Sequence, residues 1–373
     1  MKRWYVSFYR VFYCGKIFDN IKPQYYSLIV EKKLILGAIY MQDYNTTDHA
    51  NNQEDEILKD VTKSGRERPW KEKKIANISY AELLQILKFQ KAGLVGACGR
   101  VLEFKPTDEG YLKLFKTWFC KSKLCPVCNW RRSMKNSYQT QKIVEAVIND
   151  KPKARWLFLT LTAKNVADGD SLKQGLSDMT KAFNKLFKYK KVKQNLVGFM
   201  RNIEVTVNED TGFYNQHMHV LLCVEKTYFR DSENYISQKE WTSLWKKALQ
   251  TNYTPVVHVQ AIKPNKKGDK AIESAIKETG KYSVKSADYL TDNQNRNLEV
   301  VSDLEYGLYR KRMISYGGLL KEKHKELNLD DAEDGDLIQT SDDEEVSEME
   351  EEANSILAVW NYEKQNYYLR KSN

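Results

Sequence analysis

The sequence lacks the long apolar segment that a membrane-spanning helix needs, since no uninterrupted run reaches roughly 18 residues. Its first residues, "MKRWYVSFYRVFYCGKIFDN", are aromatic, but Arg10 and Lys16 interrupt them and no small-residue cleavage site follows. We therefore expect a short strand or an ordered extension there, and neither a signal peptide nor a membrane partner.

Cysteine and histidine are scarce, with six cysteines and five histidines in 373 residues. Three of the cysteines, Cys120, Cys125 and Cys128, nevertheless fall within nine residues. This clustering indicates metal chemistry in a reducing cytoplasm rather than a disulfide framework, so we expect a cytoplasmic protein.

Basic residues are absent from residues 330–352, which carry 13 acidic groups and no lysine or arginine. The formal net charge of the whole chain is +10, so the remaining residues form a body that is more basic still. Such a body favours a polyanionic partner such as DNA. The acidic segment is predicted to be a disordered, solvated linker, which could also screen the basic body against non-specific DNA.

The spacing of apolar residues predicts an α+β protein of two domains or one large domain. Strands and helices alternate from residue 155 onward, and the order strand, helix, hairpin, helix, strand, helix is typical of a sheet that is largely antiparallel. The expected strands are "CGRVLEFK", 111–120, 155–163, 196–208, 216–224 and 255–262. The expected helices are 79–90, 129–150, 171–188, 237–250 and one within 270–285 that ends near Gly280 or just past Tyr282.

The segment "CKSKLCPVCNWRRSMK" predicts a zinc site. Cys125 and Cys128 form a CxxC pair, Cys120 lies close by, and Cys98 in "ACGRV" is the natural fourth ligand. Four thiolates suit structural Zn²⁺. A redox-active CxxC is the alternative, and the additional cysteines argue against it.

The start of the helix after these cysteines is basic. Trp130, Arg131, Arg132 and Lys135 are predicted to contact DNA phosphates. The alternative is a solvated basic face with no partner.

The segment "HMH" places His217 and His219 on one face of a strand, because residues two apart in a strand point the same way. Glu204, on the strand joined through the turn "EDTGFYN", is spaced to face them. Two imidazoles and a carboxylate suit Mn²⁺ or Mg²⁺ with open coordination positions. His258 competes as the third ligand, and a pair of buried core histidines is the alternative to a metal site.

The segment "KETGKYSVK" combines Glu278, Lys281, Tyr282 and Lys285. On a helix, the glutamate and the tyrosine would share one face. A tyrosine beside a metal can act as a nucleophile, and neighbouring lysines favour the phenolate and bind phosphate oxygens. The alternative is a surface aromatic residue in a chain with 23 tyrosines, and Tyr289 is a less favoured second nucleophile.

Taken in order, "FLTLTAKNV", "HMHVLLCV" and "KETGKYSVK" resemble the three motifs of rolling-circle replication initiators of the HUH endonuclease superfamily. The Rep proteins of small plasmids from Gram-positive bacteria are the most similar group. The segments "RERPWKEKK", "CGRVLEF", "LCPVCNWRRSMK" and "MISYGGLLKE" also resemble that group, so the likeness covers residues 64–325.

The resemblance implies an HUH domain, ferredoxin-like or RRM-like, with a central antiparallel five-stranded sheet, flanking helices and a preceding zinc-binding region. It implies that His217, His219 and Glu204 bind the catalytic metal, although many members use a third histidine that this sequence lacks at a matching place. Tyr282 would nick DNA and form a 5′-phosphotyrosine, and Glu278 would activate water for the terminating cut. Lys285 and Lys281 would contact phosphate, Lys285 because "YxxK" recurs in the family.

The partners implied are single-stranded and double-stranded origin DNA, a host helicase and a DNA polymerase, with a homodimer left open. The expected domains are an N-terminal extension (1–63), a zinc- and DNA-binding region (64–150), a nickase domain (151–325), the acidic linker (326–355) and a C-terminal segment (356–373). A single-tyrosine transposase or a relaxase is an alternative function. A non-catalytic, zinc-containing DNA-binding regulator is another.

Overall fold

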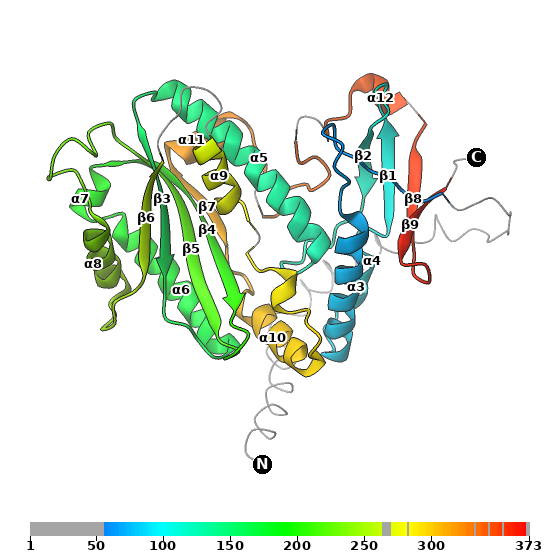
Figure 1. Ribbon diagram of the computed structural model, residues 1–373, viewed down its shortest axis with the longest axis horizontal. Coiled ribbons are helices and arrows are strands. Elements are labelled where there is room, and N and C mark those ends of the chain that lie inside the picture. The colour runs from blue at the N-terminus through cyan, green and yellow to red at the C-terminus, as the bar shows by residue number, and fades with distance from the viewer. Residues whose placement is uncertain are drawn as a thin grey trace, which may run out of the picture. The chain divides into compact units, whose positions relative to one another are not determined.

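The segment "HMHVLLCV" belongs to one strand of a five-stranded antiparallel sheet (Figure 1). The strands of this sheet follow the order β6, β3, β5, β4, β7, and each neighbouring pair is antiparallel. The bounds are β3 (Arg155–Thr162), β4 (Leu196–Val207), β5 (Tyr214–Val224), β6 (Val257–Ile262) and β7 (Ile314–Gly318). Strand β5, which carries both histidines of "HMH", is therefore the central strand.

The computed structural model describes residues 56–262, 270–281, 283–331, 333–341, 344–352 and 354–370. The strand or ordered extension expected at the start of the chain lies outside the described residues. The chain divides into two compact units, one formed by Met1–Val127 with Val346–Asn373 and the other by Cys128–Glu345, as far as these residues are described. This division differs from the expected boundaries at residues 150 and 325.

Helices cover both faces of the five-stranded sheet in the second unit (Figure 1). Their bounds are α5 (Pro126–Asp150), α6 (Gly169–Leu186), α7 (Lys190–Lys193), α8 (Gln238–Leu249), α9 (Lys270–Thr279), α10 (Gln294–Gly307) and α11 (Leu319–Glu326), with a short 3₁₀ helix η1 (Ser286–Asp288). Side chains from α5, α9 and α11 pack with one face of the sheet into a single apolar core; among them are Val144, Ile276, Leu320, Met200 and Leu221. The histidines lie on this same face, because 217, 219 and 221 alternate in step along β5.

Helices α6 and α8 form where amphipathic spacing and a capping residue coincide. In α6 the buried positions include Leu172, Leu176, Met179 and Phe183, and the side chain of Asp168 accepts a hydrogen bond from the backbone N–H of Ser171. In α8 the residues "SQKE" form the start, and Ser237 accepts from the N–H of Glu240 at 3.2 Å. Such N-caps each contribute about 1 kcal/mol and fix where the helix begins.

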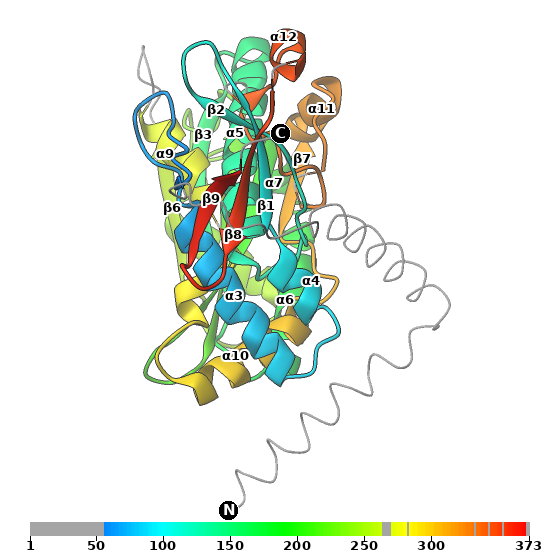
Figure 2. The ribbon, with the colours of Figure 1, turned by 90° about the vertical axis from the view of Figure 1, so that its right-hand side faces the viewer.

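A second, four-stranded antiparallel sheet lies in the first unit, where two of its strands were expected but their pairing with the last strands of the chain was not. Its order is β2, β1, β8, β9, so the last strands of the chain pair with the strands that precede the cysteine cluster (Figure 2). The elements of this unit are α3 (Trp70–Ile86), α4 (Ala92–Ala97), β1 (Val101–Pro106), β2 (Leu112–Thr117), α12 (Glu348–Glu352), β8 (Ile356–Asn361) and β9 (Asn366–Arg370). The C-terminal segment is therefore part of the unit that carries Cys98, Cys120 and Cys125.

The acidic segment differs from the solvated, disordered linker that its composition predicts. In its described residues, Glu333, Thr340 and Glu344 are buried. Glu344 forms an ion pair with Arg131 of α5, with 2.8 Å between Oε2 and Nη2. Carboxylates lose their hydration here because a buried guanidinium and backbone N–H groups replace the water, which charge composition alone does not reveal.

Candidate functional site

The two histidines of β5 lie in a patch of polar side chains on one face of the five-stranded sheet. His219 is paired in register with Thr160 of β3 and with Asn202 of β4, and His217 is paired with Glu204. Paired residues of antiparallel strands point to the same face, as do residues two apart, so these five side chains share one surface. The spacing of "HMH" and of Glu204 therefore places them as the sequence predicts.

Three neighbours hold the imidazole of His219. Its Nε2 atom lies 3.0 Å from Oε2 of Glu204, and its Nδ1 atom lies 3.3 Å from the hydroxyl of Thr160. Phe158 stacks on the ring, with 5.7 Å between centroids and an interplanar angle of 16°. Contacts on both nitrogens and on the ring face fix the orientation of the imidazole, as an ordered metal ligand requires.

The charges around Glu204 favour its anionic form. Burial alone would raise the pKa of Glu204, but the hydrogen bond from His219 and the positive charge of Lys285 outweigh it, so the pKa lies below its ordinary value. The Nζ atom of Lys285 is 3.4 Å from Oε1 of Glu204. Among the described residues, this Oε1 atom is buried without a hydrogen-bond partner.

His217 is held in its neutral form by its surroundings. Burial lowers its pKa, the neighbouring charges of His219 and Lys285 lower it further, and Glu204 opposes them. A neutral imidazole has a lone pair available for a metal, whereas imidazolium does not. Two imidazoles and a carboxylate on one face of the sheet are therefore a donor set that fits a divalent cation.

The position of His258 makes it a poor third ligand. It is paired in register with Thr160, so it lies on the same face but one strand farther from β5, at the sheet edge formed by β6, and its side chain is exposed. Neighbouring strands are about 4.8 Å apart, which places β6 roughly 10 Å from β5. Glu204 is the residue that reaches His219.

The segment "KETGKYSVK" does not continue as one helix. Helix α9 ends at Thr279, so the helical spacing expected between Glu278 and Tyr282 does not apply. Glu278 is half-buried in the last turn and pairs with Lys281. Tyr282 itself lies outside the described residues.

The residues on both sides of Tyr282 are hydrogen-bonded to β4. The side-chain amide of Asn202 donates to the carbonyl of Lys281 at 2.9 Å, and the backbone N–H of Val205 donates to the carbonyl of Ser283 at 2.7 Å. Lys285, which follows, reaches Glu204. The chain flanking the tyrosine therefore runs along the strand that carries the candidate ligand Glu204.

Asp288 in η1 lies near this site and belongs to no motif that is recognisable in the sequence. Burial raises its pKa, and the charge of Glu204 adds to that effect, while the backbone N–H and the charge of Lys285 oppose it. Tyr289, the alternative nucleophile, is fully buried in the core. This burial is typical of a core tyrosine.

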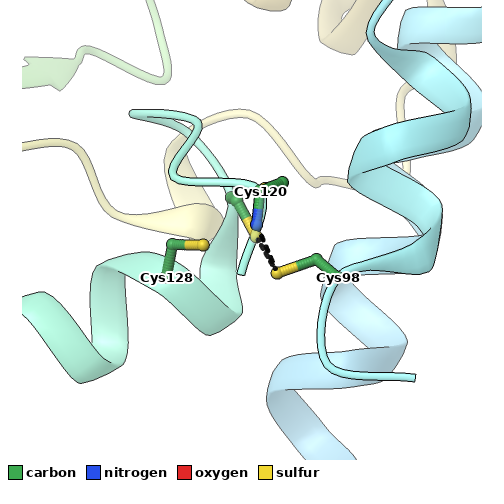
Figure 3. A group of neighbouring side chains, drawn as sticks. Cys98, Cys120 and Cys128 are labelled. Atoms are coloured by element: carbon green, nitrogen blue, oxygen red, sulfur yellow. Dashed lines mark hydrogen bonds between the residues drawn. The ribbon is translucent and has the colours of Figure 1, made fainter. Parts of the chain in front are cut away.

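The four predicted cysteines come together in one group. The sulfur atoms of Cys98, Cys120, Cys125 and Cys128 all lie within 4.8 Å of one another, and three of these residues are buried (Figure 3). Cys98 lies between α4 and β1, Cys120 and Cys125 between β2 and α5, and Cys128 in the first turn of α5. Four thiols at this separation fit a tetrahedral metal site such as that of zinc.

A buried lysine lies beside this cysteine group. The Nζ atom of Lys74 in α3 donates to Oδ1 of Asn77 at 3.1 Å and to the carbonyls of Gly96 and Cys98, each at 2.7 Å. Burial lowers its pKa to about 8, and the negative charges of the cysteines oppose that shift. Asn77 also donates to Sγ of Cys125 at 3.3 Å, so α3 supplies two polar contacts to the cysteine group.

The basic start of α5 is not an open phosphate-binding face. Trp130, Arg131, Arg132 and Lys135 are all buried. Arg131 binds Glu344, Arg132 donates to the carbonyl of Glu333 at 3.1 Å, and Lys135 pairs with Asp330 at 2.5 Å. The acidic segment therefore contacts Arg131, Arg132 and Lys135, three of the side chains that were expected to contact DNA.

None of the helices in the described part of the chain combines the length and the apolar character that crossing a bilayer requires.

Comparisons with known proteins identify the family. Residues 111–368 match the family described as "Replication protein". "Protein rep" of Lactiplantibacillus plantarum is 52% identical over 315 residues, which cover 84% of this chain and 99% of the relative. "Replication protein" of Staphylococcus aureus is 56% identical over 238 residues, which cover 64% of this chain and 100% of the relative. "Protein rep" of Streptococcus pneumoniae is 43% identical over 321 residues, which cover 85% of this chain and 97% of the relative.

No solved structure matches the chain significantly. The family match spans more than half of the chain, and the relatives are aligned over nearly their whole length. Membership of this family implies DNA binding. The chain therefore belongs to the Replication protein family and is a replication initiator of the Gram-positive plasmid type that its motifs resemble.

Proposed function

We propose that the protein initiates rolling-circle replication by nicking one DNA strand at a double-strand origin, as an HUH endonuclease. The observation that carries the proposal is the contact between His219 of β5 and Glu204 of β4, with Lys285 from the segment before η1 beside Glu204. The residues on either side of Tyr282 are hydrogen-bonded to the same strand, β4. A cation-binding set that can polarise a phosphodiester is what a tyrosine nucleophile needs, and the residues on either side of Tyr282 lie next to such a set.

In this proposal His217, His219 and Glu204 hold Mn²⁺ or Mg²⁺, which when bound would polarise the scissile phosphate. The phenol of Tyr282 loses its proton to solvent water, and the positive charges of Lys281 and Lys285 favour the phenolate. Its oxygen forms a bond to phosphorus while the bond from phosphorus to the 3′ oxygen breaks. The products are a 5′-phosphotyrosine and, after the 3′ oxygen takes up a proton, a free 3′-OH that a host polymerase extends while a helicase unwinds the duplex.

Glu278 is assigned to the terminating cut. As a general base it accepts a proton from water, whose oxygen attacks phosphorus and displaces the tyrosine oxygen. The Glu278→Ala variant should form the covalent adduct at a normal rate but fail to hydrolyse it. Loss of both steps to the same extent would contradict this division of roles.

The four-cysteine group is proposed to hold structural Zn²⁺. Its role would be to stabilise the unit formed by α3, α4 and the four-stranded sheet. Metal analysis of the purified protein should find about one zinc per chain, and the Cys125→Ser variant should lose it.

The nickase proposal is tested with single-stranded oligonucleotides that tile the plasmid's own origin and carry a 3′ fluorophore. In the presence of Mn²⁺, a denaturing gel should show labelled DNA bound covalently to protein, because the 5′-phosphate side stays with the tyrosine. Tyr282→Phe should abolish the adduct, and the control Tyr362→Phe, at a half-exposed tyrosine in the other unit, should not. Tight DNA binding without any adduct would favour a non-catalytic regulator instead.

A further inference from the structure

The backbone around Tyr282 is held by donors from two different elements. Ser133 of α5 donates its hydroxyl to the carbonyl of Gly280 at 2.9 Å. Asn202 of β4 donates its side-chain amide to the carbonyl of Lys281, and Val205 of β4 donates its backbone N–H to the carbonyl of Ser283. The carbonyls of Gly280, Lys281 and Ser283, which are the described residues of this stretch, therefore each have a donor outside their own segment.

Gly280 contributes to the same arrangement through its lack of a side chain. A Cβ atom at this position would lie 2.5 Å from Oγ of Ser137 and 3.3 Å from its backbone nitrogen. Real Cβ atoms do not approach other atoms as closely as 2.5 Å, so glycine is what lets the chain after α9 lie directly against α5. Ser133 and Ser137 are four residues apart and thus lie on one face of α5.

Asn202 provides the one side-chain donor of the two that is fully buried, since Ser133 is only half-buried. It lies in register with His219, and it is two residues from Glu204 on the same strand. A single side chain therefore connects the backbone before Tyr282 to the row of the sheet that carries the candidate metal ligands.

The segment "NWRRSMKNS" makes two different sets of contacts. Its basic residues face the acidic segment, whereas its serines face the chain that carries the tyrosine. Ser133 and Ser137 thus contact the chain next to Tyr282, a role that the basic composition of this segment does not indicate.

We propose that Asn202 and Ser133, with Gly280 packed against Ser137, form a cradle that positions the Tyr282-bearing backbone for attack on DNA. This inference rests on the proposed function of Tyr282. Reactions of a fixed nucleophile are sensitive to its placement, and a displacement of about 1 Å can lower a rate by roughly a hundredfold. None of the cradle residues touches the reacting atoms in this scheme, so Asn202 and Ser133 are positioning residues.

The test measures the single-turnover rate of adduct formation at saturating oligonucleotide, together with the Kd for the same oligonucleotide. Asn202→Leu and Ser133→Ala, which remove the donors, should lower the rate by about tenfold to a hundredfold. Their Kd values should stay within about twofold of the wild type, because neither side chain is assigned to DNA binding. Ser133→Thr, which keeps the hydroxyl, should restore most of the rate.

Gly280→Ala provides a second route to the same conclusion. The added methyl group should displace the segment from α5 and lower the rate, and Ser137→Ala in the same chain should recover part of it by removing the clashing hydroxyl. This suppression reports on local geometry even if Asn202→Leu were to lower the thermal stability.

The outcomes separate this inference from the function on which it rests. If Tyr282→Phe still forms the adduct, the proposed nucleophile is wrong. If Tyr282→Phe is inactive while Asn202→Leu and Ser133→Ala react at the wild-type rate, only the cradle is overturned. Equal loss of rate in Ser133→Ala and Ser133→Thr would also overturn it, since a hydroxyl donor could not then be the cause.

Discussion

The Nε2 atom of His219 lies 3.0 Å from Oε2 of Glu204, and this contact joins the central strand β5 to its neighbour β4. Both side chains are almost completely buried, with relative exposures of 9% and 8%. A hydrogen bond to a carboxylate in such surroundings is strong and orders both partners. The other oxygen of Glu204 faces Lys285, so the carboxylate connects the histidine pair to the segment after Tyr282.

The first prediction concerns the carboxylate of Glu204. Glu204→Gln keeps the shape and can still contact His219, but it removes the negative charge that a divalent cation requires. We expect the Mn²⁺ affinity of the DNA-free protein to fall by at least about tenfold, the lower range for changes around a metal site. Isothermal titration calorimetry with Mn²⁺ measures this without depending on nicking activity.

The matched control for this prediction is Glu209→Gln, at an exposed position in the turn between β4 and β5. It removes the same charge from the same hairpin and should leave Mn²⁺ binding unchanged. Equal affinities in wild type and Glu204→Gln would show that this glutamate orients His219 without binding the cation.

The second prediction concerns the ion pair between Arg131 and Glu344, whose side chains are 1% and 2% exposed. Arg131 also donates to the carbonyl of Leu337 at 2.9 Å. Removing one partner of a buried pair leaves the other charge without compensation, which typically costs about 3–5 kcal/mol. Arg131→Met and Glu344→Gln should therefore each lower the free energy of unfolding by about that amount in denaturant titrations, and the double variant should lose less than the sum.

An exposed pair in the same unit serves as the control. Lys181 and Asp178 are 3.5 Å apart and largely solvated, so Asp178→Asn should change stability by less than about 1 kcal/mol. The original expectation that Arg131 contacts DNA leads to the opposite result. Under that expectation Arg131→Met would weaken DNA binding and leave the free energy of unfolding unchanged.

The candidate site could be predicted from the sequence where its signal is local. Alternation places His217 and His219 on one face of a strand, and the short hairpin places Glu204 opposite them. The cysteine spacing likewise predicts the four-thiol group. In each case residues close in sequence carry most of the pattern, and Cys98 alone comes from a more distant segment.

The remaining features depend on contacts between distant segments, which local spacing does not encode. The pairing of β1 with β8 joins the two ends of the described chain, and no periodicity in either strand names its partner. Lys74 and Asn202 belong to ordinary helix and strand patterns, so only the fold shows what they touch. Helix α9 ends before Tyr282 where Gly280 meets α5, a steric relation that the helical spacing of "KETGKYSVK" conceals.

The third prediction concerns the pH dependence of the acidic segment. Burial alone would raise the pKa of Asp331, but hydrogen bonds from the backbone of Asp334 and from Arg312 outweigh it and lower the pKa from 3.8 to about 2. A carboxyl group whose pKa is lowered by folding stabilises the folded state above its unfolded pKa, and this contribution is lost as the pH falls toward the folded value. The contribution of Asp331 should therefore be complete above pH 5 or so and disappear between about pH 4 and pH 2.

Thermal unfolding measured between pH 5 and pH 2 tests this assignment by difference. Asp331→Asn should be less stable than the wild type at pH 5, and the two proteins should converge as the pH approaches 2. Asp292→Asn, at an exposed carboxylate of the same unit, should follow the wild type throughout. A constant difference between wild type and Asp331→Asn over this range would show that protonation of Asp331 is not involved.

The fourth prediction concerns Lys74, whose ammonium group is fully buried and directs its three hydrogen bonds to Asn77, Gly96 and Cys98. In the described part of the chain, no carboxylate lies within ion-pair distance of it. Four thiolates around a divalent zinc ion leave a net negative charge, and a buried cation next to them offsets it. Lys74→Met keeps the length and apolar stem of the side chain but removes this charge. We expect its zinc affinity to fall by about tenfold to a hundredfold, the range found for residues that support metal ligands.

Competition with a chromogenic zinc chelator measures the affinity of the intact chain for zinc. Lys71→Met, at an exposed position three residues earlier on the same helix, removes an equal charge away from the cysteines and should bind zinc as the wild type does. If Lys74→Met retains zinc normally while its thermal stability falls, the lysine supports only the packing of α3 and α4. Because both variants carry the same net charge, a loss of zinc that is confined to Lys74→Met can come only from the charge beside the thiolates or from the three hydrogen bonds that fix it there.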